Sequence, residues 1–424
     1  MKVMWFTFAP IGRAAQILYG TPTQSGGWVD ATFTGLLPYI EENRLTLQIV
    51  ALDSKEVCVT DEETGVVYRT VNVPRNRGKR GAAEDQAKFK ALIEEFSPDV
   101  IQIWGTEFTF GLDVIEAAGK IPVCFYIQGV MDSLVKHPLG DLPAFALFRQ
   151  LGPTSFFKFR SLRKWHKINA KHVTLEAEMI AKSAGLILDN EWTCAQYRHC
   201  TDRFYFVPLA ANPCFSKETW ELSACERHTL FTVAGGICPQ KGVHEAVLAV
   251  ARLKEKYPDI KLYIPGGISS RKPTFLYDSV FIRHLRKIIS QYGLEDNVCF
   301  TGRLSPAEMA ERMGKSHAFI MPSCVETHSS SLREAMLVGL PSVSACVGSV
   351  PEFLHHGSNG FLYRYGEPET LSYYVDRIFS DDALAQRLGA SAKQTVSEMF
   401  PQSTVGETTW KVYEQIMNGE KENG

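Results

Sequence analysis

The chain has no run of about 18 uninterrupted apolar residues, the length that a helix needs to span a membrane. Its apolar beginning, residues 1–6, is too short for the core of a secretory signal peptide. We therefore expect a chain that is soluble or attached at most to a membrane surface. The predicted location is the cytoplasm, with peripheral contact at the inner face of the membrane as a second option.

Several kinds of site are missing as well. The ten cysteines show no C-x-x-C spacing, which argues against a disulfide framework and favours reduced thiols. Neither an Asp-x-Asp pair nor a cluster of His and Cys stands out, so we expect no essential metal ion. The formal net charge of -2 excludes a protein dominated by a basic field, and we expect no nucleic-acid partner.

What the chain does contain is a repeated alternation of short apolar strands and longer amphipathic stretches. This alternation predicts parallel sheets with helices on both faces. Because 424 residues exceed what one hydrophobic core usually supports, we expect two α/β domains. The expected strands are 2–8, 45–52, 100–103, 122–127, 185–188 and 204–207 in the first half, and 229–234, 260–264, 297–300, 317–321, 341–346 and 360–363 in the second.

The expected domain boundary lies at residues 208–213, where two prolines bracket small and polar residues. We assign residues 1–210 to an N-terminal domain and 211–400 to a C-terminal domain. Residues 401–424 contain a last helix, because apolar side chains recur at helical spacing over 402–418. Periodicity alone does not say on which domain this helix docks.

The richest polar segment is 321–336, which follows an apolar strand and leads into a short helix. Ser329, Ser330 and Ser331 lie in the turn at the N-terminus of that helix. Unpaired N–H groups and the helix dipole favour an anion there, such as a diphosphate. An ordinary serine-rich helix cap explains the same pattern.

Two glutamates belong to the same segment: Glu326 on the loop and Glu334 inside the helix. Carboxylates at such a place suit bidentate hydrogen bonding to the vicinal hydroxyls of a sugar. Glu334 as a solvated helix residue is the alternative.

A second strand-to-helix turn contains Gly235, Gly236 and Lys241. Adjacent glycines allow a close approach of the backbone to a ligand, and a lysine can bind phosphate as a point charge. Taken singly, a lysine before a helix is more simply an ordinary solvated residue. The spacing is not that of a P-loop. Arg303 follows another strand in the same way, and loops at the carboxyl ends of parallel strands converge on one crevice.

Taken together, these segments resemble the family 4 retaining glycosyltransferases with the GT-B fold. The matching elements are Lys241-Gly242, the pair Glu326 and Glu334 with seven residues between them, Gly339-x-Pro341, Gly348 to Glu352, and Asn359 to Leu362. The match covers roughly residues 228–400. It implies two Rossmann-like domains that face each other across a cleft, with the last helix crossing back to the N-terminal domain.

The resemblance also implies roles for the residues. Lys241 and Glu326 are the expected catalytic residues: Lys241 binds the donor diphosphate, and Glu326 contacts the transferred sugar. Glu334 binds the nucleotide ribose, amides near Ser329–Ser331 hold the distal phosphate, and Gly236, Arg303 and His328 complete the donor site. The donor, a UDP- or GDP-sugar, is a substrate, and no cofactor is expected.

The implied activity is transfer of a sugar, with retention of anomeric configuration, to a glycan or lipid-linked saccharide in cell-surface polysaccharide biosynthesis. A nucleotide-sugar epimerase and a binding protein that has lost catalysis stay open as alternatives. A sugar phosphorylase is a third, without support from the sequence.

Two positions depart from the family pattern. An arginine usually precedes the lysine, but this chain has Gly235-Gly236-Ile237, so one diphosphate contact is either missing or supplied by Arg271, Lys272 or Arg303. Many members have a histidine after the strand equivalent to 122–127, where this chain has Gln128. Glutamine can bind a hydroxyl but cannot transfer a proton.

The N-terminal half resembles the family more weakly. Gly26 and Gly27 precede a helix in the manner of the family's glycine loop, although a flexible turn explains them equally. Glu107 follows a strand, and we expect Glu107 and Gln128 on the acceptor side. Segment 156–167 mixes aromatic and basic residues, which fits contact with an anionic membrane or, more simply, a packed helix with a solvated basic face.

Overall fold

The computed structural model describes residues 1–20, 26–143, 155–209, 211–232, 237–266 and 280–419, the side chains of 155–162 and 402 excepted. The chain divides into two compact units. Unit 1 comprises Met1–Val135, Trp165–Ala210 and Phe400–Gly424, and unit 2 comprises Lys136–Lys164 and Ala211–Met399.

The units differ from the expected domains in one segment. The sequence assigns residues 136–164 to the N-terminal domain, whereas the structure places them in unit 2. The reason is tertiary: Gln240 Nε2 donates to the carbonyl of Pro138 (3.0 Å), and the Tyr365 hydroxyl donates to the carbonyl of Gly140 (2.5 Å). The other expected limits, near 210 and 400, lie at borders of the same units.

Unit 1 alternates strands and helices along most of its length. In chain order its elements are β1 (Lys2–Thr7), α1 (Arg13–Tyr19), α2 (Gly27–Glu41), β2 (Thr46–Leu52), β3 (Cys58–Thr60), β4 (Val67–Val71), α3 (Ala83–Phe96), β5 (Val100–Trp104), α4 (Phe110–Ala118), β6 (Val123–Tyr126), α5 (Met131–Lys136), α7 (Ser155–Lys182, which begins in unit 2), β7 (Gly185–Leu188), α8 (Glu191–Tyr197), β8 (Phe204–Phe206) and α16 (Gln402–Asn418).

In the described part of unit 1, eight strands form one sheet in the order β3-β4-β2-β1-β5-β6-β7-β8. The β3–β4 pair is antiparallel and the other neighbours are parallel. Without β3, the order is that of a Rossmann sheet with one additional strand. The strand order reverses between β1 and β5, and ligands of such sheets bind outside the carboxyl ends of the strands at that point.

Strand β1 shows why the sheet is buried on both faces. Alternate side chains of a strand point to opposite faces. Val3 and Trp5 accordingly lie in the apolar layer formed with α1, α2 and α16, and Met4 and Phe6 lie in the layer formed with α3 and α4. The uninterrupted apolar sequence of β1, which predicted a parallel strand, therefore contributes side chains to the apolar layers on both faces of the sheet.

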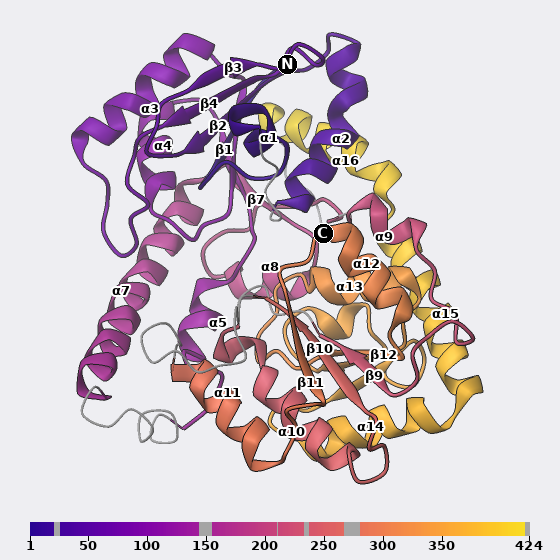
Figure 1. The fold of residues 1–424 in the computed structure, drawn as a ribbon. Helices are drawn as coiled ribbons and strands as arrows, with labels where there is room; N and C mark the ends of the chain where they lie inside the picture. The colour runs from indigo at the N-terminus through magenta and orange to yellow at the C-terminus, as the bar shows by residue number, and fades with distance from the viewer. Residues whose placement is uncertain (21–25, 144–154, 210, 233–236, 267–279, 420–424) are drawn as a thin grey trace. The chain divides into compact units, whose positions relative to one another are not determined.

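The last helix, α16, is part of the core of unit 1. It runs beside α2 (Figure 1), and the rings of Tyr39 and Trp410 stack with centroids 4.7 Å apart. The buried hydroxyl of Tyr413 accepts a hydrogen bond from Trp5 Nε1 (2.8 Å) and donates one to Gln102 Oε1 (2.6 Å). Residues from the end of the chain thus complete a sheet built from its beginning.

Unit 2 has the same strand–helix alternation. Its elements are α9 (Pro213–Lys217), β9 (Thr229–Phe231), η2 (Pro239–Lys241), α10 (Val243–Leu253), β10 (Lys261–Pro265), α11 (Val280–Gln291), β11 (Val298–Gly302), α12 (Pro306–Lys315), β12 (Ala318–Met321), α13 (Ser330–Val338), β13 (Ser342–Ala345), η3 (Val350–Glu352), β14 (Phe361–Tyr363), α14 (Pro368–Ser380) and α15 (Asp382–Met399).

The six strands that the structure describes in unit 2 are all parallel, in the order β11-β10-β9-β12-β13-β14. This is the Rossmann order, with the reversal between β9 and β12. Helices α10, α11 and α14 pack together, and α9, α12 and α13 form a second group (Figure 1). Within the described ranges, no helix is long and apolar enough to cross a membrane.

Local sequence explains where the helices of unit 2 begin and end. At α12, Ser305 and Glu308 form a capping box, in which the Glu308 carboxylate accepts from the Ser305 N–H at 2.7 Å. At α13, Gly339 ends the helix in the left-handed conformation (φ 88°), as the Gly-x-Pro sequence predicts.

Candidate functional site

Lys241 and Glu326 lie in the loops that follow β9 and β12, the two strands between which the order reverses. Lys241 Nζ is 2.7 Å from Glu326 Oε1. Burial acts to lower the pKa of Lys241, but the charge and hydrogen bond of Glu326 outweigh it, and the pKa is raised. The structure therefore brings the two expected catalytic residues together as a charged pair at the switch point of the sheet.

Two glycines allow this pair to form. Gly242 has φ 64°, and a side chain there would overlap the carbonyl oxygen of Pro322. Gly348 has φ 54°, and a side chain there would overlap the carbonyl oxygen of Glu326. Since the Cys324 N–H also donates to the carbonyl of Gln240 (2.9 Å), the loops after β9, β12 and β13 are in direct backbone contact.

The N-terminus of α13 lies in the same loop as Glu326. Ser329 is buried and has φ 49°, a left-handed conformation that is uncommon for a residue other than glycine. No side chain caps the helix, and the buried hydroxyls of Ser323 and Ser329 have no hydrogen-bond partner in the described part of the chain. Ser330 and Ser331 form the half-buried first turn. Such a terminus favours an anion.

Glu334 and His328 flank that terminus. His328 is buried, and Glu334 is half-buried on α13. Although the Glu334 side chain keeps some exposure, burial raises its pKa to about 8. Its charge in turn contributes to the raised pKa of Cys214 on α9, after burial of that thiol. The carboxyl group of Glu334 is therefore mostly protonated at neutral pH and can donate as well as accept a hydrogen bond.

Other expected donor-side residues are only partly placed. Arg303 follows β11, two strands from β9, and is exposed without a partner among the described residues. Gly236, Arg271 and Lys272 lie outside the described residues. Of the three cations that could replace the family's arginine, Arg303 is thus the one with a known position.

In unit 1, the structure brings Glu107 and Gln128 together. They follow β5 and β6, which are neighbours in the sheet. A Cβ added to Gly105 would overlap the Glu107 carboxylate and lie 3.5 Å from Gln128 Cδ. Gln128 Nε2 is buried and has no hydrogen-bond partner within the described ranges. The two side chains expected on the acceptor side therefore share one place at the carboxyl edge of the sheet.

Gly26 and Gly27 begin α2 on the β1 side of the same switch point. Gly26 has φ 98°, and a Cβ there would lie 2.9 Å from Ile11 Cβ, in the loop after β1. Gly27 faces open space. Of segment 156–167, the side chains of 156–162 lie outside the described ones, and Trp165 is half-buried.

Sequence reasoning missed a buried polar cluster beneath Glu107. Glu176 on α7 is 1% exposed and accepts hydrogen bonds from Thr106 Oγ1 (2.5 Å) and Tyr197 OH (2.9 Å). His172, one turn earlier, lies with Nε2 2.7 Å from the carbonyl of Thr106. Burial raises the pKa of Glu176 to about 8. The i, i+4 spacing of His172 and Glu176 was the available signal, but their partners are distant in sequence.

Also missed was the turn at residues 137–141, which packs on the loop before Lys241. His137 Nδ1 is 2.8 Å from Asp141 Oδ1, and Gly140 lies so close to Pro239 that a side chain would overlap its carbonyl. The turn residues Pro138 and Gly140 predict a turn but not where it docks.

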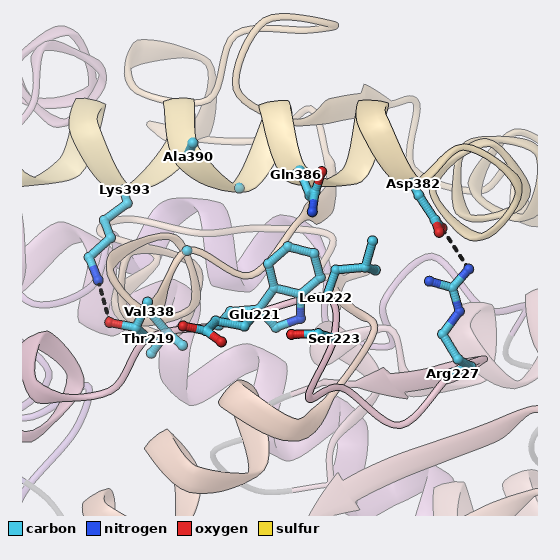
Figure 2. Close-up of a pocket in the computed structure, with 13 residues that line it drawn as sticks. Thr219, Glu221, Leu222, Ser223, Arg227, Val338, Asp382, Gln386, Ala390 and Lys393 are labelled. Atoms are coloured by element: carbon cyan, nitrogen blue, oxygen red, sulfur yellow. Dashed lines mark hydrogen bonds and ion pairs between the residues drawn. The ribbon is translucent and has the colours of Figure 1, made fainter.

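A pocket of about 780 Å³ lies elsewhere in unit 2, at the opposite end of α13. Figure 2 shows Lys393 and Asp382 reaching from α15 to Thr219 and Arg227. The Lys393–Thr219 distance is 2.9 Å and the Arg227–Asp382 distance 2.6 Å. Since none of the site residues above lines this pocket, it is separate from the candidate site.

Comparison with known proteins finds similarity to a family in the C-terminal part. Residues 217–395 match the family model described as glycosyl transferases group 1. An uncharacterized glycosyltransferase of Methanocaldococcus jannaschii is 26% identical over 192 residues, 45% of this chain and 46% of that protein. The chain thus aligns with about half the length of this curated relative.

Solved structures resemble the whole chain. Sucrose-phosphate synthase from Thermosynechococcus elongatus has a TM-score of 0.72 at 15% identity and covers 99% of this chain and 100% of its own. HepE from Anabaena in complex with UDP-glucose has a TM-score of 0.63 at 15% identity, covering 98% and 100%. At this identity the likeness concerns the fold, and it confirms the predicted GT-B class.

Proposed function

We propose that the protein, whose residues 217–395 match the family model of glycosyl transferases group 1, transfers a sugar from a nucleotide-sugar to an acceptor. The observation that carries the proposal is the Lys241–Glu326 pair, with Nζ and Oε1 2.7 Å apart at the switch point of the unit 2 sheet. It lies beside an uncapped helix N-terminus, so a cation, helix N–H groups and a carboxylate adjoin one another.

In the proposed site, the donor diphosphate binds Lys241 and the N-terminus of α13. The negative charge that develops on the leaving nucleoside diphosphate is stabilised by these groups. Glu326 then exchanges its partner Lys241 for hydroxyls of the transferred sugar, and Glu334 binds the ribose. The HepE complex, which contains UDP-glucose, supports a UDP-sugar as donor, and a GDP-sugar stays a second option.

We further propose that the reaction retains anomeric configuration, needs no metal ion or other cofactor, and uses Gly26, Gly27, Glu107 and Gln128 for the acceptor. A glycan or lipid-linked saccharide in cell-surface polysaccharide biosynthesis is the proposed acceptor, and the cytoplasm, including the inner face of the membrane, is the proposed location. Retention is checked by NMR of the product anomer, and metal independence by activity in excess EDTA.

The test of donor binding is a thermal-shift panel of UDP-, GDP- and ADP-sugars. A true donor adds about 2.7 kcal/mol to the unfolding free energy at a concentration about a hundred times its Kd. Lys241→Ala removes most of this gain, because the diphosphate loses its cation. Lys315→Ala is the control. Lys315 is an exposed lysine at the end of α12, just before β12, and so lies at the amino end of that strand, whereas Lys241 follows the carboxyl end of β9. The proposal fails if no nucleotide-sugar shifts the melting temperature.

Turnover separates an enzyme from the alternatives. Glu326→Gln keeps the shape of the side chain but removes its charge, so we expect nucleoside diphosphate binding to persist while sugar transfer falls about a hundredfold or more. Conversion of the donor without any acceptor would favour an epimerase. Tight donor binding with neither hydrolysis nor transfer would favour a protein that only binds nucleotide-sugars.

A further inference from the structure

The segment between β4 and α3 in unit 1 carries four cationic residues within six positions: Arg75, Arg77, Lys79 and Arg80. Arg80 is compensated by ion pairs with Glu116 and Glu178. Arg75 donates to the carbonyl of Leu52, and its charge contributes to the lowered pKa of Asp53. Arg77 and Lys79 are therefore the cations of this segment that no carboxylate compensates within the described ranges.

Arg77 is held in place by two contacts. Its Nε donates to the carbonyl of Glu107 at 3.0 Å, and its guanidinium lies 4.7 Å from the centroid of the Phe108 ring. The Phe108 ring in turn packs against the ring of Phe8, just after β1, with ring centroids 5.7 Å apart. The guanidinium is thus positioned at the carboxyl ends of β1 and β5, on the two sides of the switch point.

The two Nη atoms of Arg77 indicate what kind of ligand this residue can bind. Its two Nη atoms have no hydrogen-bond partner among the described residues, and the side chain is half-buried. A guanidinium that is already oriented loses little freedom on binding and presents a planar fork of donors. Such a fork matches phosphate or carboxylate oxygens better than an ammonium group does.

Two lysines flank this position. Gly78 packs closely on α7: an added Cβ would lie 2.5 Å from the carbonyl oxygen of Ile168 and 3.3 Å from Lys171 Cβ, so the backbone beside Lys79 lies close to that of Lys171. Both are exposed and without a carboxylate partner in the described ranges. The charge of Arg77 also reaches His172, whose pKa is lowered first by burial and then by Arg77.

A second chemistry adjoins the cations. Arg77 Nε binds the backbone of the residue whose carboxylate lies beside Gln128. Cations that suit an anionic group therefore lie next to a carboxylate and an amide that suit hydroxyls. Both sets lie at the carboxyl ends of the strands. A molecule with a phosphate at one end and hydroxyls at the other matches both.

We propose that Arg77, with Lys79 and Lys171, binds a phosphate group of the acceptor, so that the acceptor is a phosphorylated, polyhydroxylated molecule. The inference rests on the proposed function, because it concerns the acceptor of that reaction. The phosphate can be a monoester on a small sugar or part of a lipid headgroup, and the recognition is the same for both.

The test measures binding of inorganic phosphate and glucose 6-phosphate to the full chain by calorimetry, and co-sedimentation with phosphatidylcholine vesicles with and without phosphatidic acid. We expect binding in at least one arm. Arg77→Gln should weaken it about tenfold or more, and Arg77→Lys should restore only part, since it returns the charge without the fork. Lys171→Gln, an exposed change that leaves the Glu107 contact intact, should also weaken it.

The matched control is Lys120→Gln, which removes an exposed, unpaired cation after α4. It should change none of these affinities. Binding of glucose 6-phosphate identifies a small acceptor, and binding confined to phosphatidic acid vesicles identifies a lipid surface. Equal binding by wild type, Arg77→Gln and Lys171→Gln, or no binding in any arm, overturns the inference. Donor thermal shifts measured on the same variants report on unit 2, so a failure here is distinct from a failure of the proposed function.

Discussion

At the residue scale, Glu176 shows how burial decides the charge of a side chain. The residue is 1% exposed, and burial raises the pKa of its carboxyl group from 4.5 to about 8, helped by the charge of Glu107 and opposed by hydrogen bonds from Thr106, Tyr197 and the Met131 N–H. The pKa of Cys200, three residues after α8, is raised first by burial and then by the charge of Glu176. The folded state therefore binds a proton that the unfolded state releases at lower pH.

This raised pKa predicts a pH-dependent effect of Glu176→Gln. In the wild type, stability is fully present below the unfolded pKa of 4.5 and is lost as pH rises toward the folded value of about 8. Glutamine can accept both hydrogen bonds but does not ionise. As pH rises across this window, we expect the unfolding free energy of Glu176→Gln to increase relative to that of the wild type by up to about 1.4 kcal/mol per pH unit.

Urea unfolding of both proteins at about pH 5 and about pH 8 measures this difference. Glu414→Gln, an exposed change on α16, should show no such pH dependence. If the difference between Glu176→Gln and the wild type is the same at both pH values, the carboxyl group of Glu176 is not protonated in the folded state.

At the element scale, the close crossing of α2 and α16 depends on two glycines. A Cβ on Gly406 would overlap the carbonyl oxygen of Gly35, and Tyr39 and Trp410 stack along the same contact. Alanine normally favours a helix over glycine by about 1 kcal/mol. At this crossing we expect the opposite, namely that alanine in place of glycine lowers the stability of the protein.

We therefore expect Gly406→Ala to destabilise the protein by about 1 to 3 kcal/mol, since the added methyl separates the helices. Chemical denaturation monitored by circular dichroism measures the change. Ser403→Ala, at an exposed position of the same helix, should have little effect. A stabilised Gly406→Ala would mean that the two helices do not approach as described.

Most elements follow from the sequence, and the two missed strands have a physical explanation. The twelve expected strands are all present, with limits within three residues of the expected ones. Strand β3 has three residues, partly exposed at the sheet edge, and β4 carries Arg69 and Thr70 between its apolar residues. Short edge strands bury little apolar surface, so their pattern is weak; pairing with β2 makes β4 a strand.

At the scale of the whole molecule, the chain ends in the unit where it began. Val405, Val412 and Tyr413 of α16 are buried in the core that also holds Val3 and Trp5. The core of unit 1 therefore joins side chains of the first strand to side chains of α16. Among the described residues, those buried in this layer all belong to unit 1.

This topology predicts that removal of residues 401–424 affects the units unequally. Hydrogen exchange measured by mass spectrometry should accelerate in β1, β5 and α2, which lose the contacts of α16. Exchange in β12 and α13 should stay close to that of the full chain. Removal of residues 420–424 alone is the control, and an equal acceleration in both units would contradict the prediction.

The sequence by itself determined twelve of the described strands, the helix limits that caps and prolines mark, and the identity of the paired glutamates. It did so because apolar periodicity, helix caps and the segment from Glu326 to Glu334 are local patterns. The positions of Lys241, Glu107 and Gln128 after strands were readable in the same way.

Only the tertiary structure decided what these residues touch. The 2.7 Å pair of Lys241 and Glu326, the pKa of about 8 at Glu334 and the transfer of segment 136–164 to unit 2 all depend on residues far apart in the chain. The same holds for Arg77, whose orientation comes from Glu107 and Phe108. Burial and proximity are properties of the folded chain, so no local pattern contains them.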